Sequence, residues 1–367
     1  MRSKRKLLLL TSLVSWLWLV QRHLRKRPDV VTTTGWLAPI IWEGTFNRRA
    51  LRDHYARRNL TVGLAVFAAG SRPQPRLPAV PYQVCPGIVP ILSWGLTVIS
   101  RTPRVPTMKA AAPLTPPPGT GNARVGRAFS RSFGKLNSRV RALGRAAAGH
   151  LEPFLRSAKK HFMTGYRAVF YIMVDDPHRL PDLEPGPLQT FKALPLAQDR
   201  GWHDLDLVRM RQLGELVADH VQGEVDFLFS AAADQVFQGD FGVETLGSSV
   251  AQLHAWWWYR AARDFPYERR PRSAACIPSG HGDFFYDGAL VGGTPLRVLH
   301  LVEECLKGAL QDMKHGLNST YESHLNKYFF LHKPTTLLSP EYGWDAVLHP
   351  PAQVRYVKVL RHPKAAW

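Results

Sequence analysis

Acidic side chains are missing from two long parts of this 367-residue sequence. Residues 1–27 contain eight Lys or Arg and no Asp or Glu, and residues 71–149 contain twelve and again no acid. These twenty charges equal the formal net charge of +20, so the rest of the chain is balanced. A nucleic-acid-binding protein carries its positive excess on the folded domain itself. The charge distribution therefore argues against a nucleic-acid partner.

Cysteine is also scarce. Cys85, Cys276 and Cys305 lack the spacing of a metal site and permit one disulfide at most. The hydrophobic fraction of 45% is ordinary for a globular protein with a core. The length is sufficient for one large domain or two of medium size.

The N-terminal basic residues flank the apolar run Leu7–Val20. As a helix this run spans about 21 Å, which is short for a bilayer core but tolerable in the thinner membranes of the early secretory pathway. No small-x-small cleavage site follows it, so we expect an uncleaved signal-anchor at 7–20, a cytosolic tail at 1–6 and a short stem at 21–36. A cleaved signal peptide is the alternative. Sequons at Asn59 and Asn318 fit a luminal chain.

Hydrophobic patterning in the remainder predicts an α/β fold. The runs 60–69, 167–174 and 224–233 are typical of buried strands. Apolar residues spaced three and four apart predict a helix from residue 151 and another over about 204–221. Alternating strands and helices indicate a largely parallel sheet. Ligands of such sheets bind beyond the carboxyl ends of the strands.

Residues 71–144 break this pattern. Residues 71–118 contain twelve prolines, and residues 119–144 are rich in Gly, Arg and Ser. Proline at that density excludes helices and central strands, and the stretch has too little apolar surface to offset the entropy lost on ordering. We therefore expect a disordered basic insert.

Several motifs have a more specific meaning. Near the C-terminus, YESHLNKY and SPEY combine acids, a histidine and an amide with aromatic rings, as in a polar sugar pocket. Together with WLAPIIWEGTF, EVDFLF, FGVETLG, VAQLHAWWW and FPYERRP, they closely resemble glycosyltransferase family 6, which includes the ABO blood-group and α1,3-galactosyl transferases. The resemblance covers residues 28–70 and 145–367. Residues 71–144 interrupt a stretch that is continuous in the family, so we interpret them as translated non-coding sequence or an aberrant exon, with a true loop as the alternative.

The resemblance implies a single GT-A domain of the α/β class, formed by residues 37–70 and 145–367, on an N-terminal membrane anchor. It implies a single-pass type II protein of the Golgi membrane with a luminal catalytic domain. The implied activity is retaining transfer of galactose or N-acetylgalactosamine from UDP-galactose or UDP-N-acetylgalactosamine to a terminal β-galactoside of a glycan or glycolipid. Manganese (Mn2+) is the implied cofactor.

Site residues follow from the same resemblance. The family's Asp-x-Asp metal motif matches Ala232-Ala233-Asp234, so Asp234 is the one metal ligand left and we expect Mn2+ binding to be weak or lost. Glu322 matches the catalytic glutamate that faces the anomeric carbon, where positive charge develops. Donor-binding positions match Phe67, Arg209, Ala232, Asp234, Ala289 and Lys364. Acceptor-binding positions match His254, Trp256, Trp257, Glu322 and Asp345.

Other positions depart from the family. Tyr321 replaces an aspartate that binds donor hydroxyls, and Ala146 replaces a tyrosine that stacks on uracil. Asp287 is unusual at a position that sets the donor sugar, which leaves galactose or N-acetylgalactosamine open. These departures favour an alternative function, that of a catalytically impaired relative that binds nucleotide or glycan without transfer.

Overall fold

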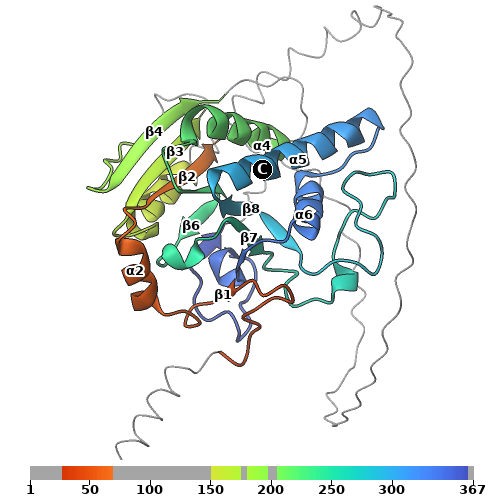
Figure 1. Cartoon of the computed structure of the whole chain (residues 1–367), viewed down its shortest axis with the longest axis horizontal. Coiled ribbons are helices and arrows are strands. Elements are labelled where there is room, and N and C mark those ends of the chain that lie inside the picture. The colour runs from red at the N-terminus through yellow and green to blue at the C-terminus, as the bar shows by residue number, and fades with distance from the viewer. Residues whose placement is uncertain (1–26, 69–149, 175–179, 197–204, 363–367) are drawn as a thin grey trace, which may run out of the picture. The chain divides into compact units, whose positions relative to one another are not determined.

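Within the residues that the structure describes, eight strands form a central sheet in the order β1-β9-β7-β8-β5-β2-β3-β4 (Figure 1). The strands are β1 (Ile40–Ile41), β2 (Thr61–Ala68), β3 (Arg167–Val174), β4 (Gln189–Pro195), β5 (Phe227–Ala232), β7 (Ser249–Leu253), β8 (Tyr286–Gly293) and β9 (Thr336–Leu338). In the same part of the chain, β8 is the one strand of this sheet that runs antiparallel to its neighbours. The expectation of an α/β fold with a largely parallel sheet is confirmed.

The structure is a computed structural model that describes residues 27–68, 150–174, 180–196 and 205–362. These residues belong to one compact unit. The anchor predicted at 7–20 and the insert predicted at 71–144 lie outside them. No helix in the described ranges has the length and apolar character needed to cross a bilayer.

The strands predicted from apolar runs are the central ones. β2, β3 and β5 lie side by side, and β2 and β3 are buried along nearly their whole length. Helices cover both faces of such a sheet, so its strands are continuous apolar runs without alternation. This is why local sequence was enough to find them.

Helices pack on both faces. α4 (Leu205–Leu216), the π-helical turn η2 (Val217–Val221), α5 (Pro295–Lys314) and α6 (Tyr321–Leu331) contribute to one hydrophobic cluster. A helix over residues 150–161 contributes to the cluster on the other face. Its predicted apolar face is buried as expected, from Leu151 and Phe154 to Phe162 just beyond its end. The remaining helical elements are α2 (Arg48–Ala56), η3 (Val243–Thr245), η4 (Ala262–Asp264) and η5 (Pro340–Tyr342).

A smaller sheet brings the C-terminal strand to the main one. In the described residues it has three strands, β10 (Trp344–Asp345), β11 (Val359–Arg361) and β6 (Gln235–Phe237). β11 is antiparallel to β6, where Arg361 pairs with Gln235, and parallel to β10, where Arg361 pairs with Asp345. Arg361 is thereby fixed next to two of the predicted site residues, Asp234 and Asp345.

Glu341 connects the N-terminal segment to this C-terminal strand. Its carboxylate is fully buried and accepts hydrogen bonds from Arg27 Nη1 at 2.8 Å and from the Glu43 backbone N–H at 2.7 Å. It also accepts the Arg355 backbone N–H at 3.1 Å. The Glu341 carbonyl accepts the Lys358 N–H at 2.6 Å, just before β11 begins. The sequence analysis placed SPEY in a sugar pocket, but its glutamate is a structural residue.

Replacing Glu341 with Gln should destabilise the protein strongly. The substitution removes the fully buried countercharge of the Arg27 guanidinium, which keeps its ion pair with the partly exposed Asp29, and breaking a buried ion pair costs roughly 3–5 kcal/mol. Urea denaturation followed by circular dichroism measures the loss. Glu304→Gln is the control, because Glu304 pairs with Lys307 on the surface and such pairs contribute at most about 1 kcal/mol. Equal losses in the two variants would contradict the role given to Glu341.

Candidate functional site

The predicted site residues gather at one edge of the central sheet. β2, β5 and β7 end there, and β8 begins there because it runs in the opposite direction. Asp234 follows β5, His254 follows β7 and Asp287 lies near the start of β8. This edge lies at the carboxyl ends of parallel strands, where ligands of α/β sheets bind.

An ion pair between Asp287 and Arg361 lies at the centre of the cluster. Arg361 Nη2 is 2.5 Å from each carboxylate oxygen of Asp287, and Asp287 Oδ1 also accepts the Ala289 N–H at 2.8 Å. The Asp287 side chain is 4% exposed and that of Arg361 is 21% exposed. Burial raises the pKa of Asp287, but the charges of Arg361 and His254 more than offset burial and hold it below its usual value.

Arg361 also links the other acids of the site. Burial lowers its pKa, but the surrounding carboxylates of Asp287, Asp234 and Glu322 raise it well above the usual value. Glu322 and Asp234 are therefore both within electrostatic reach of one guanidinium. Arg361 was not among the site residues predicted from the sequence. A buried aspartate needs a countercharge, so the unusual Asp287 was the one signal that could have indicated a basic partner.

Glu322 lies in the first turn of α6, behind the N-cap Thr320, whose hydroxyl accepts the Ser323 N–H at 3.2 Å. Burial raises the pKa of Glu322 to about 8, and the charge of Asp287 adds to the shift. A helix N-terminus and Arg361 both favour the ionised form, so burial is the stronger effect here. Near pH 7 this carboxyl is therefore largely protonated.

The neighbours of Glu322 in YESHLNKY hold its helix in place. The Asn326 amide donates to the carbonyls of Glu322 at 2.9 Å and Tyr286 at 3.1 Å, and its oxygen accepts the Tyr286 N–H at 2.9 Å. His324 Nε2 lies 2.7 Å from the Ser319 hydroxyl and 3.5 Å from Asp312. Both side chains are buried. The sequence analysis assigned the histidine and amide of this motif to a sugar pocket, but they fix α6 against β8 and α5.

The candidate donor residues are close together. The Arg209 guanidinium lies over the Phe67 ring, 5.7 Å from its centroid, and its Nη2 is 3.2 Å from Ser230 Oγ and 3.5 Å from the Ala289 carbonyl. Phe67 is paired with Ala232 across β2 and β5. Lys364 and Ala146 lie outside the described residues.

Asp234, the remaining acid of the metal motif, has a carboxylate oxygen without a hydrogen-bond partner in the described residues. This oxygen, Oδ1, is buried. Ala232, two positions earlier, contributes a methyl group. Tyr321 is buried against Gly288, where a Cβ would lie 2.5 Å from its ring. An aromatic ring therefore fills the space where the resemblance predicts a donor-binding acid.

The candidate acceptor residues follow β7. His254 Nδ1 accepts the Trp256 N–H at 3.2 Å. Burial lowers the pKa of His254, and the charges of Asp287 and Asp345, which raise it, are too weak to offset burial. Trp257 packs edge-on against Phe285, with ring centroids 6.1 Å apart. These tryptophans are partly buried, so ring surface is available to a sugar as well as to the core.

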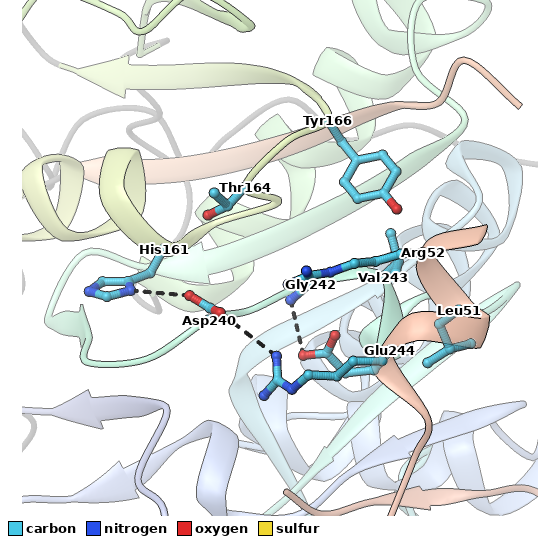
Figure 2. A pocket seen from close by; sticks show the side chains of 10 residues that line it. Leu51, Arg52, His161, Thr164, Tyr166, Asp240, Gly242, Val243 and Glu244 are labelled. Carbon is cyan, nitrogen blue, oxygen red and sulfur yellow. Dashed lines mark hydrogen bonds and ion pairs between the residues drawn. The ribbon is translucent and has the colours of Figure 1, made fainter. Parts of the chain in front are cut away.

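A separate pocket contains none of these residues (Figure 2). In it, Asp240 lies 3.7 Å from both Arg48 and His161, and Glu244 accepts the Gly242 N–H at 3.1 Å. Its volume of about 30 Å³ suits ordered water and is too small for a sugar. The lining residues are Arg48, Leu51, Arg52, His161, Thr164, Tyr166, Asp240, Gly242, Val243 and Glu244.

Comparison with known proteins agrees with these motifs. The sequence model of glycosyltransferase family 6 matches residues 4–72 and 133–366. The chain is 49% identical over 337 residues to glycosyltransferase 6 domain-containing protein 1 of Macaca fascicularis, which covers 92% of this chain and 85% of the relative. It is 40% identical over 339 residues to N-acetyllactosaminide alpha-1,3-galactosyltransferase-like 1 of Mus musculus, with coverage of 92% and 83%. It is 33% identical over 322 residues to globoside alpha-1,3-N-acetylgalactosaminyltransferase 1 of Gallus gallus, with coverage of 87% and 72%. The match to the family leaves residues 73–132 unaccounted for, and the nature of the 71–144 insert stays a prediction.

The raised pKa of Glu322 predicts a pH-dependent effect of Glu322→Gln on stability. The unfolded side chain ionises near pH 4.5 and the folded one near pH 8, so the wild type loses stability as pH rises through this window. Glutamine does not ionise, so the variant should be more stable than the wild type by roughly 4 to 5 kcal/mol at pH 8.5 and similar to it at pH 4.5. Urea denaturation at both pH values measures this difference. An effect independent of pH would show that Glu322 ionises normally in the folded protein.

Proposed function

This chain belongs to glycosyltransferase family 6, and on that premise we propose that it transfers galactose or N-acetylgalactosamine from a UDP-sugar to a terminal β-galactoside of a glycan or glycolipid, with retention of configuration. The names of its relatives support both sugars, since they include an α1,3-galactosyltransferase-like protein and an α1,3-N-acetylgalactosaminyltransferase. The sugar itself stays open, because Asp287 stands at the position that sets donor choice in the family.

The observation that carries the proposal is the position of Glu322 beside the Asp287-Gly288-Ala289 segment, since the Gly288 backbone and the charge of Asp287 both act on its carboxyl group. Arg209, which lies over Phe67, contacts the Ala289 carbonyl of this segment, and the charges of Asp287 and Asp345 both act on His254. A carboxylate between donor and acceptor can stabilise the positive charge that develops at the anomeric carbon, or attack that carbon. Either role requires ionised Glu322. His254 and the tryptophans would bind the acceptor hydroxyls and ring face.

Manganese is implied by the family, but the described residues do not fit a full metal site. Asp234 offers one unsatisfied carboxylate oxygen, while Ala232 offers none. In the described ranges, no group of three or more His, Cys, Asp or Glu side chains is arranged to hold a metal ion. A single carboxylate binds a divalent ion weakly. The proposed transfer therefore relies on the side chains of the protein.

Two of these features favour a second candidate function, binding of nucleotide or glycan without transfer. Ala232 stands where the family has the first aspartate of the metal motif, so one of the two acids is missing. The Tyr321 ring is buried at the position where the family has an acid that binds the donor sugar. Restoring an acid with Tyr321→Asp would also bury a charge in the core, at a cost of several kcal/mol. Ala232→Asp is the cleaner restoration, since Ala232 is only partly buried at a strand end.

Transfer should depend on ionised Glu322. Assays with tritiated UDP-galactose and UDP-N-acetylgalactosamine are expected to show rates that rise with pH up to about 8, because the carboxyl becomes ionised over that range. Glu322→Gln should lower kcat roughly 100-fold or more, by analogy with loss of other charge-stabilising groups. Glu304→Gln, on the surface of α5, is the control. Absence of transfer and of donor hydrolysis by the wild type at every pH would overturn the transferase proposal in favour of binding alone.

We also propose a luminal Golgi domain on the signal-anchor at 7–20. The sequon residue Asn318 supports it, because its side chain is exposed in the turn between α5 and α6. Expressed in mammalian cells, the protein should migrate faster after treatment with peptide N-glycosidase F, and Asn318→Gln should carry one glycan fewer. A wild-type band that the glycosidase leaves unshifted would contradict luminal exposure.

A further inference from the structure

Several buried polar atoms at the candidate site have no partner within the described residues, and Asp234 Oδ1 and Arg361 Nε are two of them. Buried polar groups in native proteins are almost always hydrogen-bonded, so an orphan in a functional site calls for a partner such as a water, an ion or a ligand. Asp234 Oδ1 is an acceptor and Arg361 Nε is a donor. A ligand that satisfies Arg361 Nε must therefore present an acceptor such as a phosphate oxygen.

Arg361 is fixed in place by the backbone as well as by its ion pair. The next residue, His362, donates its N–H to the Asp234 carbonyl at 2.9 Å. Arg361 itself pairs with Gln235 on one side and with Asp345 on the other. The guanidinium is therefore held beside Asp234, the remaining acid of the metal motif.

The guanidinium still has donor capacity. Nη2 holds both oxygens of Asp287, while the Nε edge makes no hydrogen bond to the described residues. Arginine presents donors in a planar fork that matches phosphate geometry. The side chain as a whole is 21% exposed, so an anion can approach the guanidinium, although the Nε atom itself is buried.

We infer that Arg361 is the resident cation of the donor site and binds the diphosphate of the nucleotide directly, so that nucleotide binding by this chain does not require a divalent metal. This inference rests on the proposed function, because it assumes a nucleoside diphosphate donor. Binding by Arg361 would explain how the site can hold an anion although Ala232 replaces one of the two acids of the metal motif. The protonated state of Glu322 near neutral pH acts in the same direction, because it removes one negative charge from the site.

Binding of UDP to the full-length protein tests the inference, with isothermal titration calorimetry in the presence of either EDTA or excess MnCl2. The wild type should bind UDP with the same Kd, within about twofold, in both conditions. Arg361→Gln should weaken binding roughly 10- to 100-fold in EDTA, the value of a hydrogen bond to a charged group. Arg361→Lys should retain part of the affinity. Arg263→Gln is the matched control, because the Arg263 side chain is 87% exposed and its ion pair is with its surface neighbour Asp264.

A folding defect must be separated from a binding defect, since Arg361→Gln leaves Asp287 buried without its partner. Asp287→Asn combined with Arg361→Gln removes both charges of the pair, so neither partner is left as an unpaired buried charge. This double variant should unfold at a temperature close to that of the wild type and still bind UDP weakly. Wild-type affinity for UDP in a folded double variant would overturn the inference.

A further variant reverses the loss of the metal motif. Ala232→Asp on the Arg361→Gln background should recover UDP binding in MnCl2 but not in EDTA. Loss of wild-type binding in EDTA, or no UDP binding by the wild type in either condition, would overturn the inference. The proposed function can fail while the inference holds. Metal-independent UDP binding without sugar transfer would support the role given to Arg361 and contradict the proposed transferase activity. Sugar transfer by a wild type that binds UDP only in the presence of Mn2+ would support the proposed function and overturn the inference about Arg361.

Discussion

The buried carboxylate of Glu341 holds the segments on which the site depends. It receives a guanidinium from Arg27 near one end of the described chain and a backbone N–H from Arg355 near the other. Its own carbonyl fixes Lys358, from which β11 continues to Arg361. A strand of three residues has little stability of its own, since isolated short strands need packing or neighbours. Glu341 therefore supports the position of Arg361 from a distance, because its backbone holds the start of β11 while its side chain binds the N-terminal segment.

Charge in the site is distributed unequally among its acids. Asp287 is stabilised in its ionised form because Arg361 contacts both of its oxygens. Glu322 interacts with the Arg361 guanidinium through its charge and without a hydrogen bond. Burial and the charge of Asp287 therefore favour the protonated form of Glu322. Two carboxyl groups near one cation thus have pKa values moved in opposite directions, a pattern typical of sites that separate acid and base roles. A substrate phosphate that drew Arg361 away from Asp287 would change both groups at once.

Local sequence predicted the parts of the fold that depend on local burial. β2, β3 and the 150–161 helix have continuous or helically spaced apolar residues because their neighbours bury them. The same reasoning could not find Arg361, because its pairing with Gln235 and Asp287 joins distant segments and leaves no periodic signal. It also misplaced polar residues of the signature motifs. A polar side chain among aromatic residues looks the same in sequence whether it binds a sugar or, like Asn326, the backbone of the next strand. The resemblance to the family supplied the candidate residues, and their gathering at one sheet edge required the topology.

The departures from the family are better understood together than one by one. Ala232 alone indicates a site that has lost affinity for its cation, and Asp287 alone indicates a site with one acid too many. With Arg361 bound to Asp287 beside Asp234, the extra acid is the group that holds a permanent cation where the metal motif is incomplete. Unlike a metal ion, a guanidinium cannot dissociate, and it stays charged at every physiological pH. If Arg361 binds the diphosphate as we infer, a covalently attached cation takes the place of a dissociable metal ion, and binding of the anionic nucleotide no longer depends on metal supply.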